Sequence, residues 1–281
     1  MSYLCGTLHE SHGADLFTKL FFKEGYHLIK EHQDAYGAEL RTFLETGAKI
    51  EIVERDDGYI DYYEGIPYYF APYEEWAEYE KEAIEYAFGR IIDVGCGAGR
   101  VALYLQNKGF FVIGIDNSSG AIRICKEHGI KNLRNIPFTK IDKSLGPIDS
   151  FVLFGNNFGL FGIYKRARWL LRRLKSISSK NAVIIAQATD PYKTEDPNHL
   201  AYHELNRKRG RMPGQLRIRI RHKKYIGSWF DYLFVSKKEL EQIIEGTGWE
   251  IRKYIDSQNA VYIVVLKKKI IRNPERFIFK K

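Results

Sequence analysis

The stretch Arg90-Ile91-Ile92-Asp93-Val94-Gly95-Cys96-Gly97-Ala98-Gly99-Arg100 decides the fold of this chain. Apolar residues flank Asp93, three alternating glycines follow, and a helical pattern begins at Ala98. Glycines between a strand and a helix let the backbone bend sharply and let a ligand approach its N–H groups. The pattern therefore predicts a buried strand that ends in a tight turn and opens a helix.

The spacing of these glycines separates the turn from a dinucleotide-binding site. Gly95, Gly97 and Gly99 follow a G-x-G-x-G pattern, whereas the dinucleotide fingerprint G-x-G-x-x-G would need a glycine at Arg100. A carboxylate at Asp93, just before the turn, would also repel a pyrophosphate. The turn is better suited to a ligand with a positive or hydrogen-donating end.

A second acid follows the next predicted strand. Residues 111–115 are mostly apolar, and Asp116 stands directly after them. In open parallel sheets ligands bind outside the carboxyl ends of the strands, where an acid commonly binds the two hydroxyls of a ribose. With both acids and the glycine turn, the chain resembles the class I S-adenosylmethionine (SAM)-dependent methyltransferases. A Rossmann-like domain that binds NAD, or no ligand, is the alternative.

The resemblance implies SAM as cofactor, S-adenosylhomocysteine (SAH) as product and a set of binding residues. An aromatic ring ahead of the glycine turn would contact the sulfonium, which aromatic faces attract by about 0.5–2 kcal/mol. The alternative role for these rings is packing in the core or in a lid. Asn156 and Asn157, which follow the fourth predicted strand, would contact cofactor or acceptor, and the alternative for them is a simple turn. The implied cofactor-binding residues are Asp93, Gly95, Cys96, Gly97, Gly99, Arg100, Asp116, Asn117, Asn156, Asn157, Tyr69 and Tyr73.

Strand and helix patterns alternate regularly from residue 91 to residue 188. This alternation predicts an α/β fold with a doubly wound parallel sheet. Helical spacing predicts helices at residues 17–28, 74–88 and 160–176. The resemblance implies a Rossmann-like sheet of seven strands whose last strand is antiparallel. We expect a cap at residues 1–75, a SAM domain at 76–267 with an insertion at about 190–235, and a basic tail at 268–281.

The insertion contains the candidate catalytic groups. His199 and His203 are four residues apart and would share one helix face, with Glu204 adjacent. One of these groups could take a proton from the acceptor, because the pKa of histidine lies near neutrality. A metal site would need a third ligand at supporting spacing, which the sequence lacks, so we expect no metal. An exposed polar helix is the alternative.

Two basic segments carry the positive charge of the chain. Residues 207–224 have a net charge of +9 and residues 267–281 of +6, so the remainder carries −6 within a total of +9. Residues 215–221 alternate strictly and predict a hairpin with residues 229–235, on which Arg217, Arg219 and Arg221 form a stripe. The stripe is either a solvated face of the hairpin or a binding site for an anionic acceptor.

Three functions therefore stay open. The first is methyl transfer to a small molecule, the second is methyl transfer to RNA or a protein recruited by the basic segments, and the third is SAM-dependent regulation without catalysis. Three cysteines without a CxxC pair indicate a reducing cytoplasm. No apolar run reaches the roughly 18 residues of a membrane span, and residues 1–15 lack the apolar core of a signal peptide. The acceptor and the oligomeric state do not follow from the sequence.

Overall fold

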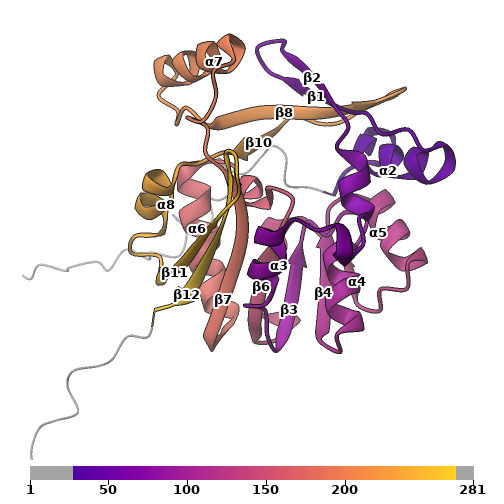
Figure 1. The fold of residues 1–281 in the computed structure, drawn as a ribbon, viewed down its shortest axis with the longest axis vertical. Helices are drawn as coiled ribbons and strands as arrows, with labels where there is room; N and C mark the ends of the chain where they lie inside the picture. The colour runs from indigo at the N-terminus through magenta and orange to yellow at the C-terminus, as the bar shows by residue number, and fades with distance from the viewer. Residues whose placement is uncertain (1–27, 270–281) are drawn as a thin grey trace, which may run out of the picture.

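The computed structural model describes residues 28–269, which build a seven-stranded central sheet in the order β11-β12-β7-β6-β3-β4-β5 (Figure 1). The five strands from β7 to β5 are parallel, and β12 pairs antiparallel with both β7 and β11. The seven-stranded, mostly parallel Rossmann-like sheet expected from the sequence is confirmed. The strands are β3 (Arg90–Val94), β4 (Phe111–Asp116), β5 (Leu133–Asn135), β6 (Ile148–Leu153), β7 (Ser178–Thr189), β11 (Trp249–Asp256) and β12 (Val261–Lys268).

Helices cover both faces of this sheet because its strands are apolar on both sides. Ile91 packs on the side of α3 and α4, whereas Ile92 packs on the side of α6 and α8. The covering helices are α3 (Glu78–Ile84), α4 (Arg100–Asn107), α5 (Ser119–Glu127), α6 (Tyr164–Ile177) and α8 (Lys237–Ile244). Short 3₁₀ turns lie in the connections between these elements: η4 (Phe138–Lys140) and η5 (Lys143–Leu145) between β5 and β6, and η6 (Asn157–Phe161) between β6 and α6.

Two helices differ from their sequence predictions. The single helix expected from Glu74 to Phe88 is a 3₁₀ turn, η3 (Tyr73–Glu75), followed by the shorter α3. The chain is extended at Trp76, whose indole is buried and donates to the carbonyl of Ala71 at 3.1 Å. The helix expected from Leu160 begins only at Tyr164, because Gly162 has a positive φ of 73° that ends η6. The helix expected from Phe17 to Leu28 and the tail beyond residue 269 lie outside the described residues.

A second sheet lies across the carboxyl ends of the parallel strands (Figure 1). Its order is β10-β8-β1-β2, with β9 paired to β8, and all of its pairs are antiparallel. The hairpin expected between residues 215–221 and 229–235 is present, but the pairing of β8 with β1 was not predicted. The strands are β1 (Glu51–Arg55), β2 (Ile60–Tyr63), β8 (Gln215–His222), β9 (Tyr225–Ile226) and β10 (Phe230–Leu233).

Helix α2 (Ala35–Thr46) is fixed to α5 by one buried carboxylate. Asp34 accepts hydrogen bonds from the backbone N–H groups of Gly37 (2.9 Å) and Gly120 (2.8 Å), and from the hydroxyl of Ser118 (2.7 Å). It therefore satisfies free donors at the first turn of both helices. The 3₁₀ turns η1 (Glu31–Gln33) and η2 (Ile66–Phe70) flank this part of the chain.

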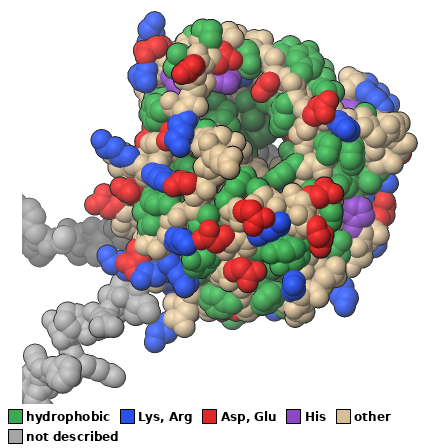
Figure 2. All heavy atoms as spheres, viewed as in Figure 1, with side chains coloured by type: hydrophobic (Ala, Val, Ile, Leu, Met, Phe, Trp, Pro, Cys, Tyr) green, Lys and Arg blue, Asp and Glu red, His purple; other side chains and the backbone are tan. Residues whose placement is uncertain are grey.

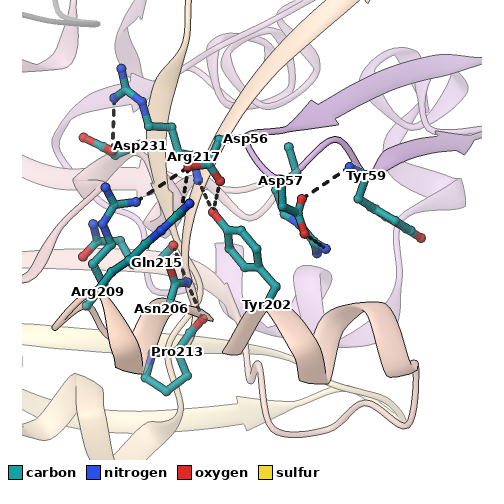
Figure 3. A network of polar contacts seen from close by, with 12 residues as sticks. Asp56, Asp57, Tyr59, Tyr202, Asn206, Arg209, Pro213, Gln215, Arg217 and Asp231 are labelled. Atoms are coloured by element: carbon teal, nitrogen blue, oxygen red, sulfur yellow. Dashed lines mark hydrogen bonds and ion pairs between the residues drawn. The ribbon is translucent and has the colours of Figure 1, made fainter. Parts of the chain in front are cut away.

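Helix α7 (Pro197–Lys208) is fastened to the second sheet by a polar network (Figure 3). The buried Tyr202 donates its hydroxyl to Asp56 at 2.6 Å and accepts the backbone N–H of Arg217 at 3.2 Å. Asn206 donates to the carbonyl of Gln215 at 2.8 Å.

None of the helices within residues 28–269 is long and apolar enough to cross a membrane.

Candidate functional site

The glycine turn after β3 has the geometry that only glycine adopts without strain. Gly95, Gly97 and Gly99 all have positive φ, and a Cβ at Gly99 would lie 2.3 Å from the side chain of Ile130. Asn157 braces the turn from η6, since its amide donates to the carbonyls of Val94 (2.9 Å) and Gly95 (3.0 Å). The turn is therefore held by the end of the fourth parallel strand as well as by its own sequence.

Two buried carboxyl groups stand at this turn. Asp93 accepts the backbone N–H of Ala102 in α4 at 3.0 Å, and burial raises its pKa to about 7. Asp116 accepts the N–H groups of Ser118 (2.8 Å) and Gly97 (3.0 Å), and burial raises its pKa to about 6. Each carboxylate oxygen can accept a further hydrogen bond. Asp116 can therefore bind two hydroxyl groups of a ligand while it holds the turn.

A large cavity opens between the glycine turn and the second sheet. Its volume is about 1540 Å³, whereas a site for one drug-sized ligand occupies roughly 300–1,000 Å³. Figure 2 shows this hollow, with many hydrophobic side chains at its rim. Asp93, Asp116 and Asn157 form one end, and β1, β8 and β10 roof the other. The cavity has room for a cofactor and a second molecule together.

Most of the cofactor residues expected from the sequence meet in this cavity. Gly99 does not line it and instead shapes the turn, as its contact with Ile130 indicates. Arg100 lines the wall, but its guanidinium is buried and ion-paired with Glu80 at 2.7 Å. The lining residues from the expected set are Asp93, Gly95, Cys96, Gly97, Arg100, Asp116, Asn117, Asn156, Asn157 and Tyr69.

The aromatic residues are arranged differently from the expectation. Tyr73 stacks on Tyr104 at 4.3 Å between ring centroids and does not line the cavity. Tyr68 lines it in place of Tyr73 and accepts a hydrogen bond from Arg100 at 2.6 Å. Tyr36 also lines it, and its hydroxyl would lie 2.5 Å from a Cβ at Gly97. The sequence carried no signal for Tyr36, which belongs to a helix far ahead of the turn.

Asn156 connects the end of the cavity beside the glycine turn with the end that β1, β8 and β10 cover. Asn156 has a positive φ of 60°, accepts the Thr189 hydroxyl on its side chain at 2.8 Å, and accepts the Tyr232 hydroxyl on its carbonyl at 2.7 Å. Gln187 accepts the N–H of Gly155 at 2.9 Å. The second sheet, through Tyr232, is thereby fixed to the end of the fourth parallel strand.

The three candidate catalytic groups lie on α7 in different surroundings. His199 lines the cavity and bonds Thr194 at 3.2 Å. His203 also lines it, is 6% exposed, and has its pKa lowered by burial. Glu204 is exposed, pairs with Arg207 and is not part of the cavity wall. Within residues 28–269 no group of His, Cys, Asp and Glu side chains is arranged to hold a metal ion.

The arginine stripe of β8 is held in ion pairs. Arg217 contacts Asp231 of β10 at 3.4 Å, and Arg219 and Arg221 each contact Glu54 of β1 at 2.9 Å. The antiparallel register sets Arg217 opposite Asp231 and Arg219 opposite Glu54. The stripe is therefore half-buried and partnered by neighbouring strands, not a simple solvated face.

Comparisons with known proteins agree with this arrangement. Residues 91–170 match a family described as a methyltransferase domain. A SAM-dependent methyltransferase from Bacteroides fragilis, solved in complex with SAH, superposes with a TM-score of 0.72 at 22% identity over 87% of this chain and 99% of that one. The DhpI–SAH complex superposes with a TM-score of 0.54 at 16% identity over 85% of this chain and 96% of that one.

Two relatives are similar in sequence over shorter spans. A putative methyltransferase of Geobacillus is 23% identical over 47% of this chain, and the match spans 60% of that protein. The putative methyltransferase YqeM of Bacillus subtilis is 35% identical over 20% of this chain, and the match spans 23% of that protein. The matched region is thus less than two thirds of the length of either relative.

The fold and the domain match agree with each other. Residues 91–170 match a methyltransferase domain, and the described residues have the Rossmann-like fold of the class I SAM-dependent methyltransferases, which confirms the resemblance expected from the sequence. The protein from Bacteroides fragilis was solved with SAH, the product form of the cofactor expected here.

Proposed function

We propose that this chain is a SAM-dependent methyltransferase that acts on a small molecule. The observation that carries the proposal is the pair of carboxyl groups, Asp93 and Asp116, at adjacent strand ends beside the glycine turn and on the wall of one cavity. The volume of about 1540 Å³ adds support, because cofactor and acceptor must lie in the site together.

The residues present fit SAM. Asp116 has acceptor capacity left for the two ribose hydroxyls, and the glycine turn leaves room for close approach of the methionyl part near Asp93. The rings of Tyr68 and Tyr69 would face the sulfonium. When bound, SAM supplies an electrophilic methyl group on that sulfonium, so the task of the protein is to position an acceptor in line with it.

The second sheet and α7 would complete the site on the acceptor side. They lie across the strand ends and line the cavity, where they would shield a bound acceptor from water. His199 and His203 stay the candidate bases for an acceptor that must lose a proton. Burial lowers the pKa of His203, so that its imidazole is neutral and able to accept a proton near pH 7. Glu204 has less support, since it is exposed and paired with Arg207.

The two other functions gain little from the structure. An RNA acceptor would use the basic segment at 207–224, but Arg217, Arg219 and Arg221 already pair with acids. A regulator without catalysis would need no space beyond the cofactor, whereas the cavity extends to Tyr59 and His199. Methyl transfer to a small molecule accounts for the space and charges best.

The test is a calorimetric titration of the full chain with SAM and SAH, followed by incubation with methyl-labelled SAM and candidate acceptors. We expect saturable binding of both ligands at one site and transfer of label to a small molecule. Protein that is folded by circular dichroism but binds neither ligand would refute the proposal. Binding without transfer to any small molecule, but with labelling of RNA added at low salt, would favour the nucleic-acid acceptor.

A further inference from the structure

The acceptor half of the cavity, which is the end roofed by β1, β8 and β10, contains arginines that are held in ion pairs. Arg55 pairs with Asp57 at 2.7 Å, and Arg219 pairs with Glu54 at 2.9 Å. Arg217 likewise contacts Asp231. Each of these three arginines thus has an acidic partner. One buried carboxyl group in this half, by contrast, has no basic partner among the described residues.

That carboxyl group is Glu51, the first residue of β1. It lies on the cavity wall, yet only 3% of the residue is exposed. Its Oε2 accepts the Tyr69 hydroxyl at 3.0 Å, and Tyr63 also interacts with it. No Lys, Arg or His of residues 28–269 lies within ion-pair distance of it. A buried carboxylate without a cation is costly, and burial accordingly raises the pKa of Glu51.

Tyrosines connect Glu51 with the cofactor half. Tyr69 packs edge-on against Tyr36 at 5.5 Å between centroids, and Tyr36 covers Gly97. Tyr69 also packs edge-on against Tyr68 at 5.8 Å, and Tyr68 faces Gly155. Two tyrosine rings therefore connect Glu51 with each of the two turns that flank the predicted methyl position. A group bound by Glu51 would belong to a molecule that reaches this position.

A second buried carboxyl group, Glu39 of α2, interacts with Glu51. It is fully buried, and neither of its oxygens has a hydrogen-bond partner. Burial and the neighbouring Glu51 raise the pKa of Glu39 to about 10, so this group is protonated and neutral at pH 7. Glu51 is the member of the pair that lies on the cavity wall, where a ligand could reach it. A cation placed against it would offset the cost of its burial.

We infer that the methyl acceptor carries a basic amino group and that Glu51 binds its ammonium form. This inference rests on the proposed function and adds the chemical class of the acceptor. The Glu51 carboxylate would accept a charge-assisted hydrogen bond from the ammonium, and the rings of Tyr63 and Tyr69 would attract the same cation. Glu51 would thereby select amines over neutral and acidic molecules of equal size.

The test uses three probes with one aromatic body and different heads: phenethylamine, 2-phenylethanol and 3-phenylpropionate. Each is titrated into the full chain saturated with SAH. We expect the amine to bind at least about tenfold more tightly than the alcohol and the acid, which corresponds to about 1.4 kcal/mol. In E51Q this preference should disappear while SAH affinity stays unchanged. E45Q, at an exposed position of α2, is the matched control and should keep the preference.

The outcomes separate this inference from the proposed function. Protein that binds SAH but binds the three probes equally, prefers the acid, or binds none of them would overturn the amine assignment alone. An E51Q protein that retains the preference would overturn the role of Glu51. Failure of the wild-type chain to bind SAH would refute the proposed function itself. Since the comparison of probes is made first on the wild-type chain, it remains decisive even if E51Q does not fold.

Discussion

The two halves of the cavity are built in different ways. The two carboxyl groups of the cofactor half come from one short span, Asp93 to Asp116, in which two neighbouring strands and the glycine turn between strand and helix place them. The acceptor half comes from β1 and β2, ahead of that span, and from β8 and β10, well after it. Local sequence thus determines the acids and turn of the first half, whereas contacts between distant segments determine the second. The predictions below probe each half separately.

The largest effect is expected at Asp116. Replacing it with alanine removes both acceptors for the ribose hydroxyls and leaves the N–H of Gly97 without its partner. Bonds to a charged acceptor contribute about 1.5–3 kcal/mol each, so SAH affinity in D116A should fall by about 100-fold or more. Calorimetry measures this change in SAH affinity. D61A, an acid on the wall of the acceptor half, is the control and should leave SAH affinity unchanged; equal losses in both variants would contradict the division of the cavity.

Asp34 should control the stability of the attachment between α2 and α5. D34A removes the acceptor of three hydrogen bonds, from Gly37, Ser118 and Gly120, and leaves buried donors unsatisfied. We expect a loss of about 2 kcal/mol, which lowers Tm by about 4–8 °C in a domain of this size. D196A removes the side-chain cap just ahead of α7, at a half-buried position, and should cost less than about 1 kcal/mol. A D34A protein as stable as D196A would show that the attachment contributes little.

Binding of SAH should weaken in mild acid. The pKa of Asp116 is raised to about 6, and hydroxyl groups donate to its ionised form, so the proton must leave on binding. Between pH 7 and pH 5 the affinity should therefore fall by about tenfold. Without ligand the sign is opposite, because the raised pKa favours folding below the unfolded value and that gain is lost as pH rises through about 6. Calorimetry at several pH values measures the slope, which D116N should reduce; an equal slope in D116N would assign it to another group.

The smallest effect is expected where the two halves meet. Y232F removes the hydroxyl that donates to the carbonyl of Asn156 at 2.7 Å. The loss of about 1 kcal/mol should speed local opening, and hence hydrogen exchange of amides in β10, by about fivefold, with SAH affinity unchanged. Y254F, in the edge strand β11 of the main sheet, is the control and should not alter exchange in β10. Unchanged exchange in Y232F would mean that other contacts fix the second sheet.

The sequence was most informative where function depends on local backbone geometry. Alternating glycines after an apolar strand predicted the turn, and an acid after each of two neighbouring strands predicted where Asp93 and Asp116 lie. For the aromatic residues ahead of the turn the sequence was less informative: Tyr69 lines the cavity as expected, but Tyr73 stacks on Tyr104 outside it, and Tyr68 lines it as well. The 3₁₀ turns η2 and η3 set these directions, and periodicity does not distinguish a short 3₁₀ segment from the start of an α-helix.

The sequence by itself determined the doubly wound sheet, the glycine turn and the two acids, because strand periodicity and glycine conformation act over a few neighbouring residues. Only the tertiary structure decided that β1 pairs with β8, that Tyr36 covers Gly97 and that Glu51 is buried without a cation. Such features depend on the burial and pairing of segments far apart in the chain. A polar side chain carries no local mark of whether folding will enclose it.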